Sequence, residues 1–238
     1  MRESAQILAA TLEEVVKRAK VGVSTEELDL FAEQFILEKG GKPGFKGYHD
    51  YPATLCTARN EVIVHGIPGK NDILQDGDLF TVDCGVLIDG FYSDAARSIA
   101  IGNASPLRKR LVETAKIALK KGIEQAIPGN KIYQISQAIQ KVIESEGFHV
   151  IYDLTGHGLG KSLHEDPIIA NYFDPAYKQI IKPGMTFAIE PIFSAGTNHM
   201  KTLSDGWTIV TKDGSDSVQQ EETILITETG NEILTKIL

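Results

Sequence analysis

Acidic residues stand at positions where an otherwise apolar strand pattern would exclude them. They interrupt the segments LFTVDCGVLIDGFYSDAARSIAI, MTFAIEPIF and SVQQEETILIT, and they are Asp83, Asp94, Glu190, Glu221 and Glu222. Carboxylates that face one another in an apolar setting repel and lose solvation, so such a group requires a compensating charge. For one isolated Asp, a solvated face or an ion pair with an arginine such as Arg97 would suffice. For the whole group, we favour a cation site.

The register of one hairpin places two of these acids together. Asp89-Gly90 is a strong two-residue turn signal between apolar strands. With these two residues as the loop, Asp94 lies opposite Gly85, which shares a face with Asp83. Asp83 and Asp94 are then diagonal neighbours, about 7–8 Å apart at the backbone. Their side chains can converge on ions between them.

Three histidines lie in sequence contexts that suit a site. His157 lies in GHGLG (156–160), where glycines would let the backbone approach a site closely. His164 follows in LHEDP, and His65 precedes Gly66 at a predicted strand end. For any one of them taken alone, an ordinary loop histidine is the favoured interpretation.

Four carboxylates and one imidazole would form a set of mainly hard oxygen ligands. Such a set suits Mn²⁺, Fe²⁺, Co²⁺ or a catalytic Zn²⁺ better than a thiolate-rich structural zinc site. Four negative charges balance two divalent cations, which can hold a water, lower its pKa and polarise a carbonyl for hydrolysis. Strand alternation puts Glu221 and Glu222 on opposite faces, so one is expected to be a ligand. The pattern leaves open which one.

The composition excludes several classes of protein. The formal net charge of −8 over 238 residues argues against a nucleic-acid binder, because phosphate binding needs clustered Lys and Arg. The two cysteines, Cys56 and Cys84, are too few for a disulfide framework and fit a reducing compartment. No apolar run approaches the roughly 18 residues that span a bilayer, and the start lacks a signal-peptide core. We therefore expect a cytoplasmic enzyme with no membrane partner.

The elements that must position these residues are two helix pairs, each followed by strands. Apolar spacing predicts a helix over 3–20, and Ser24 with Glu27 forms a capping box for a second helix that ends at Gly40-Gly41. A third helix is predicted to begin near Ser105-Pro106, with Pro at its first position. The remaining predictions are a loop over 42–60, a helix over 131–145 and strands over 62–65, 78–101, 184–193, 206–211, 217–227 and 231–236.

This order favours an α+β fold with a mainly antiparallel sheet over a βαβ array. The two halves look like rough structural repeats. Because no linker or low-complexity segment separates them, we predict one domain over residues 1–238.

Seven segments match one family in order and spacing. They are GYHDYPATLC (47–56), NEVIVHGIP (60–68), the Asp83–Asp94 pair, GHGLGKSLHEDP (156–167), PGMTFAIEP (183–191), DGWTIVTKDGS (205–215) and QEETILIT (220–227). On these segments the chain resembles the type I methionine aminopeptidases across essentially its whole length. The resemblance implies the pita-bread fold, a curved antiparallel sheet flanked by two helix pairs. It also implies a dinuclear metallopeptidase that hydrolyses the N-terminal methionine from nascent proteins and peptides.

The resemblance also implies a role for each site residue. Glu190 would act as general acid/base, His65 would contact the substrate amide and its developing amine, and His164 would stabilise the oxyanion. Glu221, rather than Glu222, would be the ligand of that pair, and Asp94 and Glu221 would bridge the metals. The implied metal ligands are Asp83, Asp94, His157, Glu190 and Glu221, and the implied methionine pocket is formed by Phe45, Tyr48, Tyr51, Cys56, Leu163 and Trp207.

Two other functions are compatible with parts of the pattern. Asp83-Cys84-Gly85 followed by Tyr92-Ser93-Asp94 is also similar to aminopeptidases directed at Xaa-Pro bonds. Those relatives usually carry a further N-terminal domain, and the implied aromatic pocket favours methionine instead. A non-catalytic peptide-binding relative would be expected to have lost metal ligands, whereas all five are present.

The partners follow from the implied role. We expect a peptide or nascent-protein N-terminus as substrate and the ribosome as a transient partner. We also expect a monomer, since no interface pattern stands out.

Overall fold

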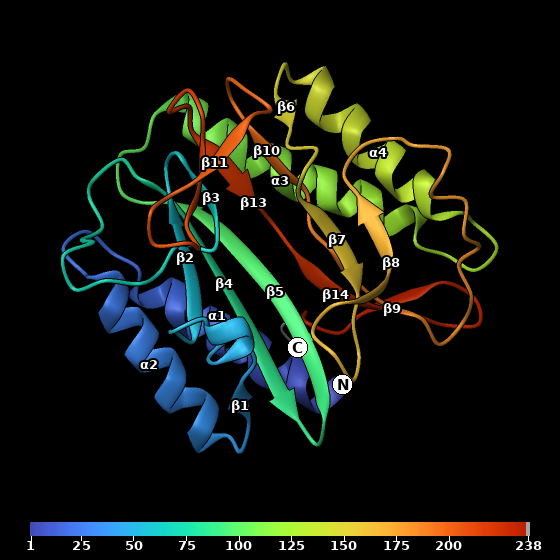
Figure 1. Ribbon diagram of the computed structural model, residues 1–238, viewed down its shortest axis with the longest axis horizontal. Helices are drawn as coiled ribbons and strands as arrows, with labels where there is room; N and C mark the ends of the chain where they lie inside the picture. The colour runs from blue at the N-terminus through green and yellow to red at the C-terminus, as the bar shows by residue number, and fades with distance from the viewer. Residues whose placement is uncertain (237–238) are drawn as a thin grey trace.

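The computed structural model describes residues 1–236 and consists of two halves, each built on a pair of helices (Figure 1). In the first pair, one helix packs against a long hairpin and the other packs beside it. The second pair packs against the hairpin and against strands from the C-terminal part of the chain. The helices are α1 (Arg2–Arg18), α2 (Thr25–Glu38), α3 (Pro106–Gln125) and α4 (Ile132–Ser145). The four predicted helices are therefore confirmed, with ends that differ by a residue or two.

Local sequence signals explain where these helices begin. The Ser24 side chain accepts a hydrogen bond from the Glu27 N–H, and the Glu27 side chain accepts one from the Ser24 N–H, which is a complete capping box. Ser105 caps α3 in the same way through the Arg108 N–H, and Pro106 occupies the first helical position. Among the described residues, none of the helices combines the length and the apolar composition that a membrane span requires.

The predicted hairpin has the predicted register. It is formed by β4 (Leu79–Ile88) and β5 (Phe91–Ala100), with Gly85 opposite Asp94 and Asp83 opposite Ala96. The turn residues Asp89 and Gly90 have φ angles of 48° and 79°. Two positive φ values in a two-residue loop match the right-handed twist of the flanking strands.

The strands pair antiparallel throughout the described residues and form four small sheets. Strands from both halves take part in these sheets. The predicted α+β fold with mainly antiparallel strands is therefore confirmed. The first sheet holds β1 (Lys42–Pro43), β2 (Leu55–Arg59), β4 and β5. The second holds β6 (His149–Val150), β10 (Ile192–Ser194) and β13 (Ser217–Gln219). The third holds β3 (Val62–Val64), β11 (Met200–Thr202) and β12 (Ile209–Thr211). The fourth holds β7 (Thr155–Gly158), β8 (Glu165–Ala170), β9 (Thr186–Ile189), β14 (Glu222–Ile226) and β15 (Asn231–Ile233).

The two halves meet along β5. The Glu221 N–H donates to the Ala96 carbonyl at 3.1 Å, and the Asp94 N–H donates to the Thr223 hydroxyl at 2.9 Å. On either side lie separate apolar cores, one under α1 and α2 and the other under α3 and α4. The seam between the cores is therefore polar, and it runs through predicted metal ligands.

Some of the strand predictions are wrong. The predicted loop 42–60 contains β1, β2 and a short 3₁₀ helix, η1 (Tyr48–Asp50), because the apolar residues of β2 pair with β4. The predicted strands 184–193 and 217–227 are each interrupted, at Glu190-Pro191 and at Gln220-Glu221. Strands β6, β7, β8 and β11 were not predicted, since they are short and rich in polar residues or glycine.

Candidate metal centre

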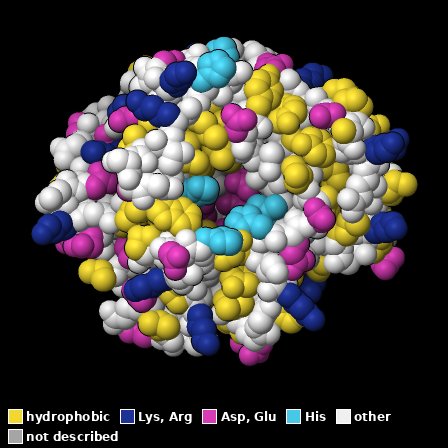
Figure 2. Space-filling view, viewed as in Figure 1, with side chains coloured by type: hydrophobic (Ala, Val, Ile, Leu, Met, Phe, Trp, Pro, Cys, Tyr) yellow, Lys and Arg dark blue, Asp and Glu magenta, His cyan; other side chains and the backbone are white. Residues whose placement is uncertain are grey.

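The five predicted ligands line one cavity of about 180 Å³ that opens to solvent. Figure 2 shows this hollow, with histidine side chains at its rim and acidic side chains at its bottom. The ligands come from both halves of the molecule: Asp83 from β4, Asp94 from β5, His157 from β7, Glu190 directly after β9, and Glu221 between β13 and β14. Both strand interruptions coincide with a predicted ligand.

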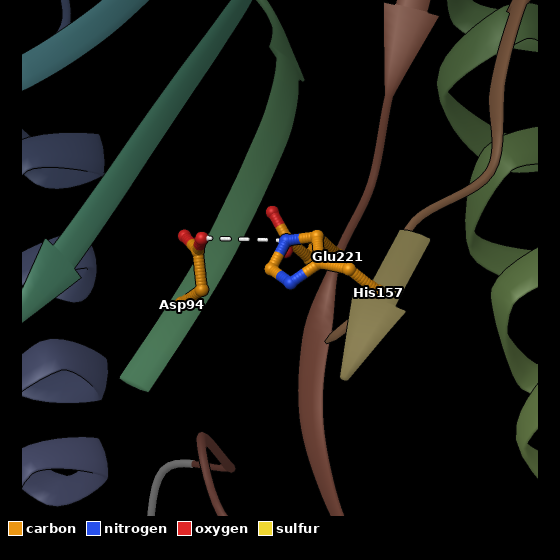
Figure 3. Close-up of side chains that lie close together, drawn as sticks. All are labelled: Asp94, His157 and Glu221. Carbon is orange, nitrogen blue, oxygen red and sulfur yellow. Dashed lines mark ion pairs between the residues drawn. The ribbon is translucent and has the colours of Figure 1, made fainter. Parts of the chain in front are cut away.

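Three of these side chains point toward one another closely enough to share an ion (Figure 3). Ligand atoms of Asp94, His157 and Glu221 all lie within 4.8 Å of one another. The Nε2 atom of His157 is 3.9 Å from Oδ2 of Asp94 and 3.5 Å from Oε1 of Glu190. Such spacing leaves room for a cation between the groups.

Hydrogen bonding fixes which nitrogen of His157 can bind a metal. Its Nδ1 atom lies 2.9 Å from the carbonyl oxygen of Gly158. A carbonyl oxygen only accepts, so Nδ1 carries the proton and Nε2 presents its lone pair to the cavity. Histidine ligands are commonly oriented by a bond of this kind.

The carboxylates lack the partners that buried charges require. All four predicted carboxylate ligands are buried. One oxygen each of Asp83, Asp94 and Glu221 has no hydrogen-bond partner among the described residues, and no Lys or Arg of this part of the chain forms an ion pair with any of the four. Buried acceptors without donors are costly, so the donor set fits divalent cations.

The shifted pKa values of these side chains also indicate that positive charge is missing near the carboxylates. Burial raises the pKa of Asp83 to about 7. Burial, followed by repulsion from neighbouring carboxylates, raises the pKa values of Asp94, Glu190 and Glu221 well above their usual range. Burial also lowers the pKa of His157 to about 4. Bound cations would take the place of the protons that these carboxyl groups otherwise retain.

Glu221 and Glu222 have different surroundings in the structure. Glu221 lines the cavity, whereas Glu222 pairs with Arg97, with Nη2 3.0 Å from Oε2, and accepts a hydrogen bond from the Thr235 hydroxyl. Arg97 thus partners Glu222 and not Asp83 or Asp94, so the alternative of an Asp–Arg97 pair is wrong for the described residues.

The predicted methionine pocket forms one wall of the same cavity. The hydroxyl of Tyr51 donates to the carbonyls of Leu55 and Gly66 at 2.9 and 3.0 Å, and the Trp207 ring packs edge-on against Tyr51 with centroids 5.0 Å apart. The wall residues are Phe45, Tyr48, Tyr51, Cys56, Leu163 and Trp207. An apolar slot therefore lies directly beside the acidic bottom.

The two predicted auxiliary histidines also line the cavity. The ring of His164 lies 4.3 Å from that of His157, and its Nδ1 atom is 2.9 Å from the hydroxyl of Tyr48. His65 has a φ of 59° and faces the Trp207 ring at 6.4 Å. Burial lowers the pKa of His65 to about 4, so this imidazole is neutral near pH 7.

Five further lining residues were not predicted: Val64, Leu154, Thr155, Ile192 and Gln219. Gln219 could have been found, because it stands two residues before Glu221 in a strand pattern and so shares its face. Its side-chain amide donates to Oε2 of Glu190 at 3.1 Å. The other four carry no signal of their own, because apolar residues and a threonine beside strands are ordinary core residues.

Comparisons with known proteins agree on one family. The model of metallopeptidase family M24 matches residues 1–228. Methionine aminopeptidase 1 of Bacillus subtilis is 46% identical over 237 residues, which cover 100% of this chain and 95% of the relative.

Solved structures give the same result. The crystal structure of methionine aminopeptidase from Thermotoga maritima superposes with a TM-score of 0.97 at 40% identity, covering 99% of this chain and 95% of that one. Prolidase from Pyrococcus horikoshii superposes with a TM-score of 0.80 at 24% identity, and the match covers 100% of this chain but 61% of that one. The second likeness concerns the fold alone.

Proposed function

The chain belongs to metallopeptidase family M24, and from that premise we propose that it is a methionine aminopeptidase, which hydrolyses the first peptide bond of chains that begin with methionine. The observation that supports the proposal most strongly is that an acidic surface and an apolar surface adjoin in one cavity. Buried acidic groups form its bottom, three of them with an oxygen that has no hydrogen-bond partner among the described residues, and an aromatic, apolar slot adjoins them.

The proposed cofactor is a pair of divalent cations, which Asp83, Asp94, His157, Glu190 and Glu221 would hold. Mn²⁺, Fe²⁺, Co²⁺ and Zn²⁺ all suit this donor set. When bound, two such ions lower the pKa of a water and polarise the scissile carbonyl. The unpartnered oxygens of Asp83, Asp94 and Glu221 support this assignment.

The proton transfers are assigned to this chain's own side chains. Glu190 accepts a proton from the attacking water and passes it to the leaving amine as the C–N bond breaks. His164 donates a hydrogen bond to the carbonyl oxygen as negative charge develops on it. His65, neutral near pH 7, contacts the substrate amide and the amine that forms from it.

The methionine side chain would occupy the slot between Tyr51, Cys56 and Trp207. Thioether sulfur contacts aromatic ring edges favourably, and Tyr51 and Trp207 meet edge-on beside Cys56 in this cluster. Phe45, Tyr48 and Leu163 complete the wall. The slot lies beside the acidic bottom, so a side chain held there brings its own peptide bond to the proposed metals.

The biological setting follows from this activity. The proposed substrates are nascent proteins and peptides, with the ribosome as a transient partner and the cytoplasm as the location. One catalytic domain over residues 1–238 and a monomeric state stay predictions.

A cleavage assay tests the function and the cofactor together. The protein is stripped of metal, reloaded separately with Mn²⁺, Fe²⁺, Co²⁺ or Zn²⁺, and given Met-Ala-Ser or Ala-Pro-Ser, with release of the free amino acid as the readout. We expect metal-dependent release of methionine from the first peptide alone. Preferential release of alanine would indicate an Xaa-Pro-directed enzyme instead. Bound metal without any release would indicate a non-catalytic peptide-binding protein.

A further inference from the structure

The loop that carries Tyr48 has a conformation that residues with side chains rarely adopt. His49 and Asp50 have φ angles of 47° and 68°, in the left-handed region that costs non-glycine residues energy. Backbone hydrogen bonds within the loop hold it: the Tyr48 N–H donates to the Phe45 carbonyl, and the Tyr51 N–H donates to the Tyr48 carbonyl. The Gly47 N–H also donates to the Tyr51 carbonyl, and the Asp50 N–H to the Gly47 carbonyl. Strain that the surroundings maintain in this way often positions a functional side chain.

The side chain that the loop presents to the cavity is the phenol of Tyr48. Its hydroxyl oxygen lies 2.9 Å from Nδ1 of His164, with the two ring centroids 5.4 Å apart. The ring of His49 packs edge-on against the Tyr48 ring at 4.4 Å. Tyr48 therefore contacts His49 through its ring and His164 through its hydroxyl.

The chemistry of the two groups decides which of them donates. A phenol is a strong hydrogen-bond donor and a weak acceptor, whereas the unprotonated imidazole nitrogen is a strong acceptor. Burial also raises the pKa of Tyr48, so its hydroxyl keeps the proton near neutral pH. The bond is therefore O–H···Nδ1, and a neutral His164 then carries its own proton on Nε2.

We infer that Tyr48 is a positioning residue that fixes the tautomer of His164 and so makes Nε2–H the donor to the scissile carbonyl oxygen. The inference rests on the proposed function, because it presupposes that His164 faces a peptide carbonyl. The His164 ring lies against that of His157, a proposed metal ligand, so it borders the reacting centre. In the other tautomer the Nε2 lone pair would face the developing negative charge and repel it.

Kinetics of Tyr48→Phe test the inference, because this variant keeps the ring in the cavity wall and removes only the hydroxyl. We expect kcat for Met-Ala-Ser to fall roughly five- to tenfold, the usual effect of one hydrogen bond, while KM stays within about twofold because the ring contacts remain. Tyr133→Phe is the control, since it removes the hydroxyl from a tyrosine of α4 that does not line the cavity. This control should leave both constants unchanged.

A double-mutant cycle separates action through His164 from a direct effect on the pocket. In the background of His164→Ala, adding Tyr48→Phe should change kcat by less than about twofold, because the group that Tyr48 orients is absent. If the two effects instead multiply, Tyr48 acts independently and the inference is wrong.

The tautomer itself is measurable without any substrate. In Zn²⁺-loaded protein labelled with ¹⁵N in its histidine rings, the His164 signals are assigned by their loss in His164→Ala. We expect an unprotonated Nδ1 and a protonated Nε2 in the wild type, and a mixture of the two tautomers in Tyr48→Phe. A proton on Nδ1 in the wild type, or an unchanged tautomer in the variant, would overturn the inference. Failure of the wild type to release methionine would instead count against the proposed function, and the spectrum would still decide the tautomer.

Discussion

Arg97 and Glu222 form an ion pair at the seam between the two halves, with Nη2 3.0 Å from Oε2 and side chains that are 18% and 16% exposed. The same guanidinium donates through Nη1 to the carbonyl of Glu221 at 2.7 Å. Arg97 therefore neutralises Glu222 and binds the backbone carbonyl of Glu221. The side chain of Glu221 does not pair with Arg97 and lines the cavity.

This relationship predicts opposite behaviour for two adjacent glutamates. Glu221→Gln should lower the affinity for Mn²⁺ by more than about 100-fold, because loss of even an indirect contact to a metal ligand costs 10–100-fold. Glu222→Gln should leave that affinity unchanged and lower the free energy of unfolding by about 1–2 kcal/mol, because a hydrogen bond to a charged group is weakened. Calorimetric titration and urea denaturation measure the two quantities. Equal loss of Mn²⁺ in both variants would contradict the assignment of Glu221 as a metal ligand and of Glu222 as the partner of Arg97.

His164 is predicted to affect turnover without affecting metal content. His164→Ala should reduce kcat by roughly 10²–10³-fold, as the loss of one oxyanion donor often does. The amount of bound metal should stay that of the wild type, because the five proposed ligands are intact. Elemental analysis of the variant alongside the peptide assay provides the check, and loss of metal would mean that His164 is itself a ligand.

Much of this architecture was predictable because the decisive signals are local. The Asp89-Gly90 turn determines the hairpin register, and that register alone brings Asp83 and Asp94 to one face. Ser24 and Ser105 mark the starts of two helices through side-chain caps. In each case the signal lies within a few residues of the structure that it specifies.

What could not be predicted depends on contacts between distant segments. The strand β2 forms because residues 55–59 pair with β4, although Pro and Gly nearby are typical of loops. Similarly, periodicity left Glu221 and Glu222 equivalent, and only the family resemblance favoured Glu221. In the structure Arg97, far away in the sequence, distinguishes them. The Tyr48–His164 contact joins two loops, so no pattern in either loop indicates it.

Gly156 is predicted to be required for the geometry around His157. A Cβ atom at this position would lie 2.4 Å from the carbonyl oxygen of Ala188 on the paired strand β9, so the backbone would have to move. Gly156→Ala should therefore lower the free energy of unfolding by about 3 kcal/mol and weaken Mn²⁺ binding. Gly69→Ala is the matched control, because a Cβ there meets no atom within 4 Å. If the two variants unfold at the same urea concentration, the close approach of β7 to β9 is not a constraint.

Metal-free protein is predicted to lose stability as the pH rises above about 4, the pKa of a carboxyl group in the unfolded chain. The pKa of Asp83 is raised to about 7, and those of Asp94, Glu190 and Glu221 are raised well above their usual range. In this range the folded protein binds more protons than the unfolded chain, so the free energy of unfolding falls with pH. The lowered pKa values of His65 and His157, both about 4, act in the opposite direction. That effect fades above about pH 6.5, the pKa of a histidine in the unfolded chain.

The sign of the slope can be read from melting temperatures measured between pH 6.5 and 8.5. In EDTA the melting temperature should fall across this range. The free energy of unfolding decreases by as much as about 1.4 kcal/mol per pH unit for each carboxyl that keeps its proton only in the folded state. With Mn²⁺ the fall should disappear, because the bound cations keep the carboxylates ionised and partnered at every pH in the range. Glu190→Gln removes one of the titrating groups and should reduce the slope in EDTA. A melting temperature that rises with pH in EDTA would contradict the buried, proton-retaining state of these four acids.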